Sequence, residues 1–350
     1  MATYVAVLKG KPGELTACRA ASPAVVAGSR LVFEVVPKYG AERDLSYFVT
    51  RMAKGAAPLW PASAIPTVDT SYIDQTQQID GTGVVLWTAQ QLLKENVSSC
   101  PVMRHDDPPG VLADIAAAVQ HVGTGVCLRL GSSDDDPTSD IASTLIPQAL
   151  KAVGVNPADT DLLIDMWTIA SKLDRDRAIP SAIAALKWAA DYGSFRTVTL
   201  LAGAFPDSIS NFPKDQATPV FRWDADFYKE VVAKKPAVLP DFGDYGPASA
   251  AMPSDISRAP LPNLRYTDQD EWQVYRESKK RPGNESFYTL CDRVVQSKHW
   301  LGAGYSWGDR EIERCSKSQP GPGTATEWRA YGTSHHLARV VDRLSKTGAP

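Results

Sequence analysis

Short apolar segments recur along the first 241 residues, and most of them stop at a charged side chain. Seven such segments lie at 5–8, 31–33, 65–68, 101–103, 126–128, 162–164 and 237–240, and an eighth at 197–201 runs into Ala202 and Gly203. Parallel strands are covered on both faces, so they read as continuous apolar runs rather than as alternating ones. The pattern therefore predicts a set of parallel β-strands.

Stretches with helical periodicity lie between these runs. Apolar residues recur at the spacing of one helix face over 112–122, 141–153 and 179–190, which is typical of helices that bury one side. Alternation of strand and helix favours parallel pairing, because each helix returns the chain to the same edge of the sheet. The sequence thus predicts an α/β fold with a (β/α)8 TIM-like barrel over residues 1–241. An open doubly wound parallel sheet is the alternative, although no GxGxxG follows the first strand.

The alternation of strand and helix ends after Asp241. Residues 242–263 are rich in glycine, proline, serine and alanine, and we interpret them as a long loop across the barrel mouth. Further helices are expected near 287–299 and at the end of the chain, where Thr333 or Ser334 is placed to cap the last helix. We expect residues 242–350 to form a C-terminal α+β extension that packs on the barrel mouth and is not an independent domain.

Charged residues at the strand ends are the first candidates for a binding site. The carboxyl ends of barrel strands converge on one ring, where such proteins bind their ligands. The residues predicted to line this ring and bind a ligand are Lys9, Glu34, Asp69, Arg104, Arg129, Asp165 and Asp241. Arg104 and Arg129 could hold a phosphate through bidentate hydrogen bonds, and the carboxylates could bind Mg²⁺ or act as an acid–base pair. The alternative is a ring of mixed charges that neutralise one another in a structural ion-pair network.

A weaker candidate is a group of basic residues in the expected extension. Arg265, Arg276, Lys279 and Lys280 lie near aromatic residues. Such side chains could contact the phosphates of a nucleic acid while an aromatic ring stacks on a base. The alternative interpretation is an ordinary solvated surface.

Two adjacent histidines, His335 and His336, lie in the expected terminal helix. Adjacent helical residues point in different directions, so one is expected to face the barrel and the other solvent. This arrangement does not favour metal ligation by the pair, and the sequence assigns neither histidine a role.

The composition limits the classes of partner. A formal net charge of −3 gives no overall attraction to nucleic acid or to a membrane surface, so polyanion binding would need a local basic patch. Five scattered cysteines without a CxxC pair argue against a disulfide framework and a zinc site, and they favour a reducing compartment. With no apolar stretch of membrane-spanning length and no signal-peptide pattern, we expect a soluble cytoplasmic protein.

Three stretches, 4–14, 31–37 and 328–337, together resemble one known family. The sequence is similar to the Beta protein family of phages and bacteria over nearly its whole length. The resemblance implies a setting in phage genomes or in bacterial mobile or defence loci, and it supplies no settled activity. It marks Lys9, Lys11, Glu34, His335 and His336 as family-like positions without giving them roles.

Two functions of different kinds remain open. One is a pocket at the strand ends that takes a phosphorylated or nucleotide-like ligand, with turnover unproven. The other is a non-catalytic interaction protein in phage–host conflict, which docks protein or nucleic acid through its C-terminal extension. The sequence contains no Walker loop, GxSxG elbow or HExxH helix, so several large enzyme classes are disfavoured.

Overall fold

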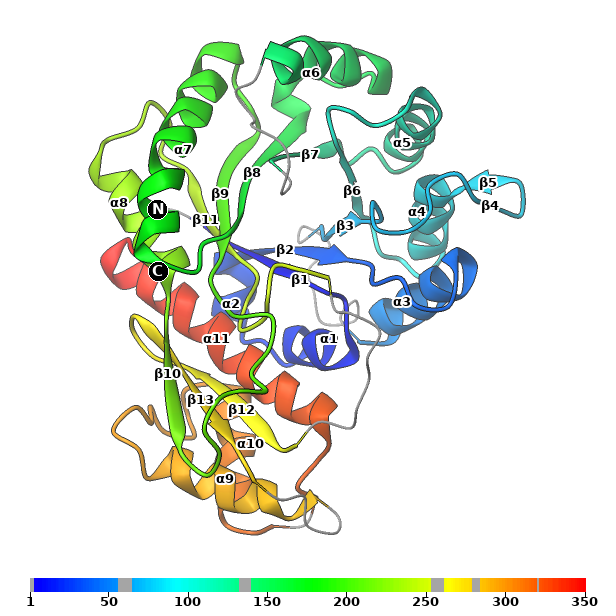
Figure 1. Ribbon diagram of the computed structural model, residues 1–350. Helices are drawn as coiled ribbons and strands as arrows, with labels where there is room; N and C mark the ends of the chain where they lie inside the picture. Colours follow the sequence, from blue (N-terminus) through cyan, green and yellow to red (C-terminus); the bar gives the residue numbers. More distant parts are fainter. Residues whose placement is uncertain (1–2, 56–64, 132–139, 253–260, 279–283, 320) are drawn as a thin grey trace.

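A closed parallel barrel occupies the upper part of the molecule in Figure 1. The computed structural model describes residues 3–350 apart from 56–64, 132–139, 253–260, 279–283 and 320. Within these residues, eight parallel strands close in the order β1-β11-β9-β8-β7-β6-β3-β2. They are β1 (Tyr4–Leu8), β2 (Ser29–Glu34), β3 (Thr67–Asp69), β6 (Cys100–Met103), β7 (Val126–Leu130), β8 (Thr160–Thr168), β9 (Thr197–Gly203) and β11 (Asp241–Asp244). The predicted barrel is confirmed, and the open sheet is not formed.

Helices surround this barrel. They are α1 (Pro12–Arg19), α2 (Pro23–Gly28), α3 (Ala41–Gly55), α4 (Val84–Lys94), α5 (Pro109–Val122), α6 (Asp140–Val153), α7 (Lys172–Tyr192) and α8 (Trp223–Ala233). The three stretches with helical periodicity correspond to α5, α6 and α7. A small hairpin of β4 (Gln78–Ile79) and β5 (Thr82–Gly83) precedes α4, and a 3-10 turn (Pro157–Asp159) precedes β8.

Alternation along the strands divides the apolar side chains between the outside and the inside of the barrel. On β1, Tyr4 and Leu8 pack outward under the helices, whereas Val5 and Val7 belong to the interior cluster. Successive side chains of a strand point to opposite faces, so Lys9 follows in the interior phase. The same two-residue step leads from Val32 to Glu34, from Val102 to Arg104, from Cys127 to Arg129 and from Leu163 to Asp165.

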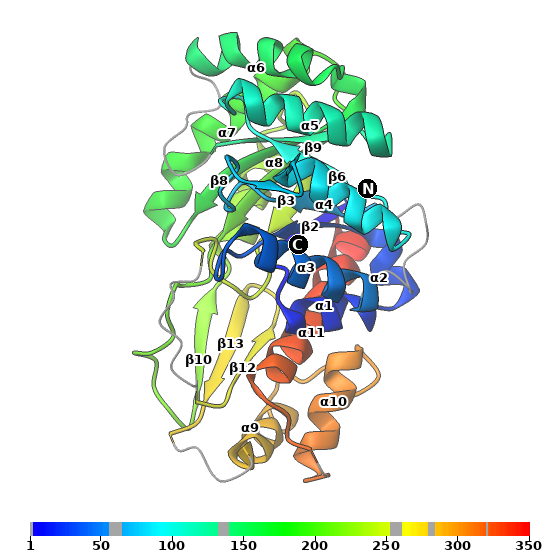
Figure 2. The ribbon, with the colours of Figure 1, turned by 90° about the vertical axis from the view of Figure 1, so that its right-hand side faces the viewer.

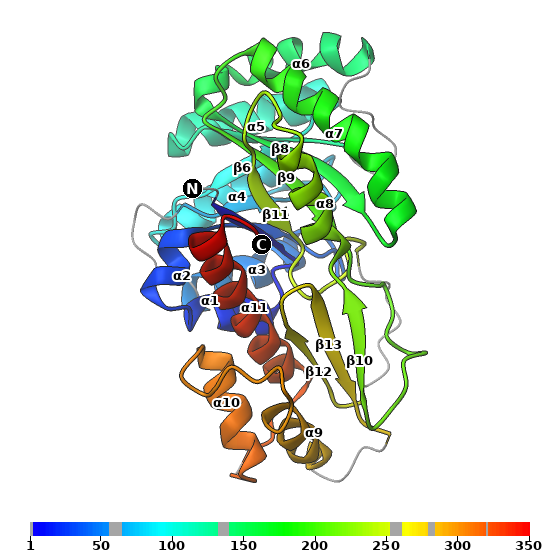
Figure 3. The same ribbon diagram turned by 90° about the vertical axis from the view of Figure 1, so that its left-hand side faces the viewer.

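A three-stranded antiparallel sheet lies beside the barrel. Its strands are β10 (Ala217–Phe221), β13 (Glu271–Arg276) and β12 (Asn263–Thr267), in that order across the sheet. Because β10 precedes residue 241, the sheet combines one strand from the barrel's part of the chain with two from the C-terminal part. The remaining helices are α9 (Ser286–Val295), α10 (Trp307–Ser316) and α11 (Ala325–Thr347). Figures 2 and 3 show α11 running from the flank of the barrel toward α9 and α10.

Helix α11 joins the barrel to the extension, because it packs against α1 and α2 on one side and against β12 and α10 on the other. It begins at Ala325, where Thr324 and Glu327 form a capping box. The predicted cap at Thr333 or Ser334 is therefore wrong. Both residues are buried inside the helix, and the Ser334 hydroxyl accepts a hydrogen bond from the backbone N–H of Gly308 at 3.1 Å.

The two adjacent histidines of α11 are both fully buried, so the expectation that one faces solvent is wrong. His335 Nδ1 lies 2.9 Å from Asp309 Oδ2, and its Nε2 lies 2.8 Å from the carbonyl oxygen of Thr267. His336 Nε2 lies 3.0 Å from Asp244 Oδ2 at the end of β11. Both histidine side chains are buried because α11 lies between the barrel on one side and β12 and α10 on the other. His335 anchors α11 to α10, and His336 anchors it to the barrel strand β11.

Candidate functional site

Six of the seven predicted ring residues meet at the carboxyl end of the barrel. They are Lys9, Glu34, Asp69, Arg104, Arg129 and Asp165, and we call them the strand-end network. Five of them lie at, or next to, the carboxyl ends of their strands, and Asp165 lies three residues before the end of β8, all in the interior phase. The structure brings these side chains together, while their role in ligand binding stays a prediction.

Arg129 is the centre of this network and is fully buried. Its Nη1 donates to Glu34 Oε1 and to Asp69 Oδ2, both at 2.7 Å. Its Nε and Nη2 donate to Asp165 Oδ2 at 3.0 and 2.7 Å, and Nη2 also donates to the Tyr245 hydroxyl at 2.7 Å. A guanidinium has five N–H groups, so these bonds leave Arg129 no donor for a phosphate.

Two further cations complete the network. Lys9 Nζ donates to Glu34 Oε2 at 2.5 Å and to the carbonyl oxygen of Ala250 at 2.6 Å. Arg104 Nη2 lies 3.8 Å from Asp69 Oδ2. Three cations therefore face three carboxylates, which is the self-neutralising arrangement that the sequence left open. The contact with Ala250 also places the segment after β11 across the barrel mouth.

Neighbouring charges in the network hold Asp69 and Arg129 in their ionised forms. Burial acts to raise the pKa of Asp69, but Arg129 and Arg104 outweigh it, and the pKa lies below its usual value. Burial acts to lower the pKa of Arg129, yet Tyr245 and Asp165 raise it well above normal. Burial raises the pKa of Tyr245, so its hydroxyl stays protonated and donates to Asp165 Oδ2 at 2.6 Å.

Asp241 lies at the opposite end of the barrel, so its predicted place in the ring is wrong. The apolar run 237–240 precedes β11 instead of forming it, and Asp241 is the first residue of that strand. Its Oδ2 accepts a hydrogen bond from Arg30 Nη2 at 2.6 Å. Tyr245 follows Gly243 by the two-residue interior step and occupies the place in the network that the sequence analysis gave to Asp241.

The geometry offers no metal site in this network. Its three carboxylates direct oxygens toward Arg129, which supplies their counter-charge. Over the described ranges of the chain, no three His, Cys, Asp or Glu side chains are arranged to hold a metal ion. We therefore infer no Mg²⁺ site from the carboxylates.

A separate basic pocket opens beside the carboxyl ends of β1 and β2. Its volume is about 420 Å³, and we call it the rim pocket. The side chains that line it include the bases Lys9, Lys11, Lys38 and Arg43, the carboxylate Asp44, and the aromatic rings Tyr39, Tyr47 and Phe48. With Lys9 paired to Glu34, the three bases Lys11, Lys38 and Arg43 against the carboxylate Asp44 give the pocket an excess of positive charge.

Asp44 shapes the loop between β2 and α3 that forms one wall of the rim pocket. Its carboxylate accepts hydrogen bonds from the backbone N–H groups of Lys38 at 2.6 Å and Tyr39 at 2.9 Å. The Arg43 guanidinium carbon lies 4.2 Å from the centroid of the Tyr39 ring, and Lys38 Nζ lies 4.7 Å from it. Asp44 is thus engaged by the backbone, and the loop it fixes places both cations at the pocket.

Lys11 connects the rim pocket to a wider concentration of positive charge. Burial lowers the pKa of Lys11, Glu14 opposes this effect, and the cations Arg329, Lys9 and Arg265 add to it. An anion bound here would relieve that repulsion. The sequence analysis identified Lys9 and noted Lys11, but it missed Lys38, Arg43 and the tyrosines. The feature that could have identified them is the concentration of basic and aromatic residues shortly after the end of β2.

The arginines predicted to contact nucleic acid do not form an open basic face. Arg276 is buried and donates to the backbone carbonyl of Ser210 at 2.8 Å, and Arg265 lines an internal cavity. Lys279 and Lys280 lie outside the described residues. Arg276 is thus buried and Arg265 mostly buried, and their contact with nucleic acid stays a prediction.

The closed barrel and its charged carboxyl end define the class of the protein, a (β/α)8 barrel with an additional α+β region. The sequence profile of the Beta protein family matches residues 4–342. The chain therefore belongs to the Beta protein family, as the resemblance of its sequence indicated. No curated protein matches it. None of the helices in the described residues has the length and apolar character needed to cross a membrane.

Proposed function

We propose that the protein binds a phosphorylated, nucleotide-like ligand in the rim pocket. The observation that carries the proposal is the gathering of Lys9, Lys11, Lys38 and Arg43 around one cavity. The only carboxylate among the lining residues, Asp44, already accepts two backbone hydrogen bonds. Phosphate oxygens are recognised by such N–H donors and by positive charge. The proposal concerns binding and assigns no reaction.

The strand-end network supports the rim pocket by holding the backbone beside it. Lys9 belongs to both, since its ammonium group donates to Glu34 and also lines the cavity. The bond from Arg129 to Glu34 holds the end of β2, from which the loop carrying Lys38 begins. Matched buried charges thus fix the backbone that carries the more exposed cations Lys38 and Arg43.

The exposed aromatic rings favour a nucleotide over a simple phosphate. Tyr39 and Tyr47 line the pocket and are 56% and 50% exposed, so their rings are accessible to a ligand. Stacking of a base on an aromatic ring contributes about 1–3 kcal/mol. A ligand with a base and phosphates would use both chemical features of the pocket.

Membership of the Beta protein family supports a setting in phage genomes or bacterial defence loci, and this part of the proposal rests on the family resemblance alone. The other function left open by the sequence, docking of nucleic acid or protein through the extension, has weaker support. Of the four residues predicted to contact nucleic acid, the two that the structure describes, Arg265 and Arg276, donate hydrogen bonds to backbone carbonyls of the protein itself.

The proposal is tested by calorimetric titration of ADP into the full chain at low salt. Wild-type protein should bind saturably, and the double variant K38Q/R43Q should raise the Kd at least tenfold. The matched control R177Q/K187Q removes the same two charge types from exposed positions on α7 and should leave the Kd unchanged. Equal affinity of K38Q/R43Q and wild type, or no saturable binding by wild type, would refute the proposal. If wild type binds ADP as expected, native mass spectrometry of protein purified from nucleotide-rich cells would show which phosphorylated compound co-purifies.

A further inference from the structure

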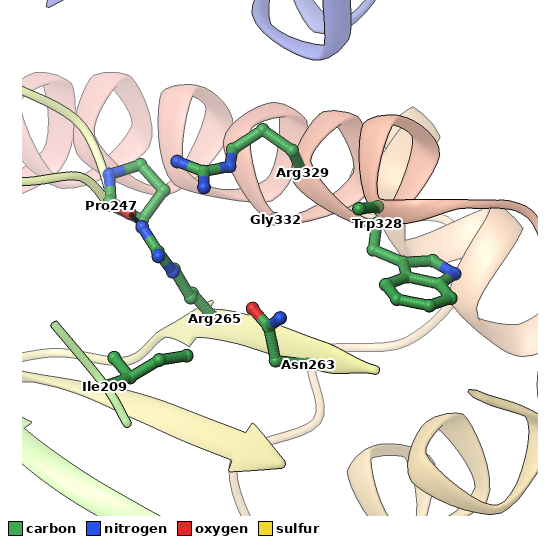
Figure 4. A pocket seen from close by; sticks show the side chains of 8 residues that line it. Ile209, Pro247, Asn263, Arg265, Trp328, Arg329 and Gly332 are labelled. Atoms are coloured by element: carbon green, nitrogen blue, oxygen red, sulfur yellow. Dashed lines mark hydrogen bonds between the residues drawn. The ribbon is translucent and has the colours of Figure 1, made fainter. Parts of the chain in front are cut away.

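A second, smaller cavity lies between β12 and α11. Its volume is about 160 Å³, which corresponds to the space of about five water molecules. Arg265 and Asn263 enter it from β12, Arg329 and Gly332 from α11, and Pro247 from the segment that follows β11. Figure 4 shows the guanidinium groups of Arg265 and Arg329 extending toward Pro247, with Trp328 at the other end. We call this space the arginine cavity.

Arg265 is the key residue of the arginine cavity. Its side chain is mostly buried, its Nη1 donates to the carbonyl oxygen of Pro247, and its guanidinium carbon lies 4.3 Å from the centroid of the Phe205 ring. Its Nε finds no hydrogen-bond partner among the described residues. A buried N–H without an acceptor is costly, and a buried charge without a counter-charge is more so.

The charges around the cavity make this deficit larger. Burial lowers the pKa of Arg265 well below its normal value, the neighbouring Arg329 adds to the effect, and Glu14 only partly opposes it. An arginine nevertheless remains protonated in proteins. Across the part of the chain that the structure describes, neither arginine of this pair has a carboxylate within salt-bridge distance. The cavity therefore contains N–H donors and positive charge, and none of its described lining residues carries a carboxylate.

The buried Arg222 shows that an unpartnered N–H alone does not make a site. Its Nε and Nη1 also have no partner in the described chain. However, its Nη2 donates to Asp224 at 3.0 Å and to Asp244 at 3.1 Å, so two carboxylates supply its counter-charge. At Arg265 the Nε lacks an acceptor, no carboxylate of the described residues lies within salt-bridge distance, and a cavity of suitable size adjoins the guanidinium.

We propose that the arginine cavity is a binding site for a small tetrahedral oxyanion of the phosphate type. Two guanidinium groups that approach one space from different elements present several N–H donors, and such donors bind phosphate oxygens with directional, charge-assisted hydrogen bonds. The anion would be either a free ion or the phosphate group of a larger molecule. Bound there, it would join β12, α11 and the segment after β11, because each contributes a lining residue. This site is distinct from the rim pocket and does not depend on the function proposed for it.

The test is a thermal-unfolding titration of the full chain with inorganic phosphate, at constant ionic strength balanced with chloride. A ligand that binds only the folded state raises the Tm with its concentration. Wild-type protein should show a saturable rise in Tm, and R265Q and R329Q should each raise the apparent Kd for phosphate at least tenfold. R177Q, on the exposed face of α7, and K38Q/R43Q, in the rim pocket, should retain the wild-type Kd. The variant R329Q decides the matter if R265Q does not fold, because Arg329 is only half-buried.

Each outcome separates this site from the rim pocket. No saturable rise in wild type, or a rise that survives in both R265Q and R329Q, would overturn the proposal. Loss of the rise in K38Q/R43Q alone would place the phosphate in the rim pocket and would equally overturn it. ADP distinguishes the two sources of the anion, because R265Q should weaken ADP binding only if the cavity takes a phosphate group of the larger ligand. If R265Q weakens phosphate alone, the cavity binds a free ion.

Discussion

Arg129 is fully buried and Arg265 is mostly buried, but their surroundings differ in the feature that decides what each can do. Around Arg129, three carboxylates and a tyrosine hydroxyl accept all five N–H groups. Around Arg265, the described acceptor is the backbone carbonyl of Pro247. The neighbouring cation Arg329 adds to the effect of burial in lowering the pKa of Arg265. A guanidinium whose donors are all used stabilises the fold, whereas one that lacks acceptors is available to a ligand. In this protein, pairing separates structural charges from binding charges better than position in the barrel does.

The largest expected effect comes from removing the centre of the strand-end network. Arg129→Met keeps much of the side-chain volume but leaves Glu34, Asp69 and Asp165 buried without their main counter-charge. Breaking a buried ion pair by removing one partner typically costs about 3–5 kcal/mol, so the free energy of unfolding should fall by that amount. Urea unfolding measures it, with R177Q as the control. A loss below about 1 kcal/mol would mean that the network contributes little to the fold.

A substitution at Gly332 should disturb the arginine cavity by steric means. A Cβ at this position would lie 2.7 Å from the backbone oxygen of Arg265, which cannot move as a flexible side chain does. Gly332→Ala should therefore destabilise the protein by about 1–3 kcal/mol despite the better helix propensity of alanine. The matched control is Gly304→Ala, where nothing lies within 4 Å of the added Cβ. If the two variants unfold at the same urea concentration, α11 and β12 are less tightly apposed than the structure shows.

Acid should weaken the strand-end network through Asp69. Its pKa is lower in the folded protein than the ordinary value of 3.8, because Arg129 and Arg104 outweigh its burial. A carboxyl group with a lowered folded pKa contributes stability that is complete above its unfolded pKa and disappears as the pH falls through the folded value. Wild type should thus lose stability relative to Asp69→Asn as the pH is lowered below about 4. Parallel pH dependence of the two proteins in urea unfolding would show that Asp69 is not held in its ionised form.

The smallest expected effect on stability is at Arg265 itself. Arg265→Met removes a buried charge that lacks a carboxylate partner, so in phosphate-free buffer the free energy of unfolding should change by less than about 1 kcal/mol. This result would contrast with the large loss at Arg129 and would come from the same type of substitution. A loss of about 3 kcal/mol or more at Arg265 would show that the residue already has a strong partner in the ligand-free protein.

The barrel and most of the strand-end network were predictable because both follow from short-range patterns. Continuous apolar runs identified the strands, and the two-residue step from interior residues such as Val7 and Cys127 leads directly to Lys9 and Arg129. The error at Asp241 arose where the apolar run 237–240 precedes the strand, so the pattern placed the strand four residues too early. Gly243 pairs with the interior residue Val5, so the two-residue step from Gly243 leads to Tyr245 as the residue that enters the network.

Contacts between distant segments could not be predicted in the same way. The arginine cavity brings Pro247, Arg265 and Arg329 together from three elements, and no local spacing encodes that meeting. The start of α11 was readable in principle, since Thr324 and Glu327 have the spacing of a capping box, but Thr333 and Ser334 were chosen instead. The burial of both histidines likewise depends on α11 lying between two other layers.

The central claim is that ligand phosphates bind to the cations of the rim pocket while the matched charges around Arg129 remain undisturbed. A crystal structure of the full chain with ADP tests this claim most directly. The account predicts phosphate density against Lys11, Lys38 and Arg43, with Arg129 still bonded to Glu34, Asp69 and Asp165. Phosphate density against Arg129, with those carboxylates displaced, would contradict it.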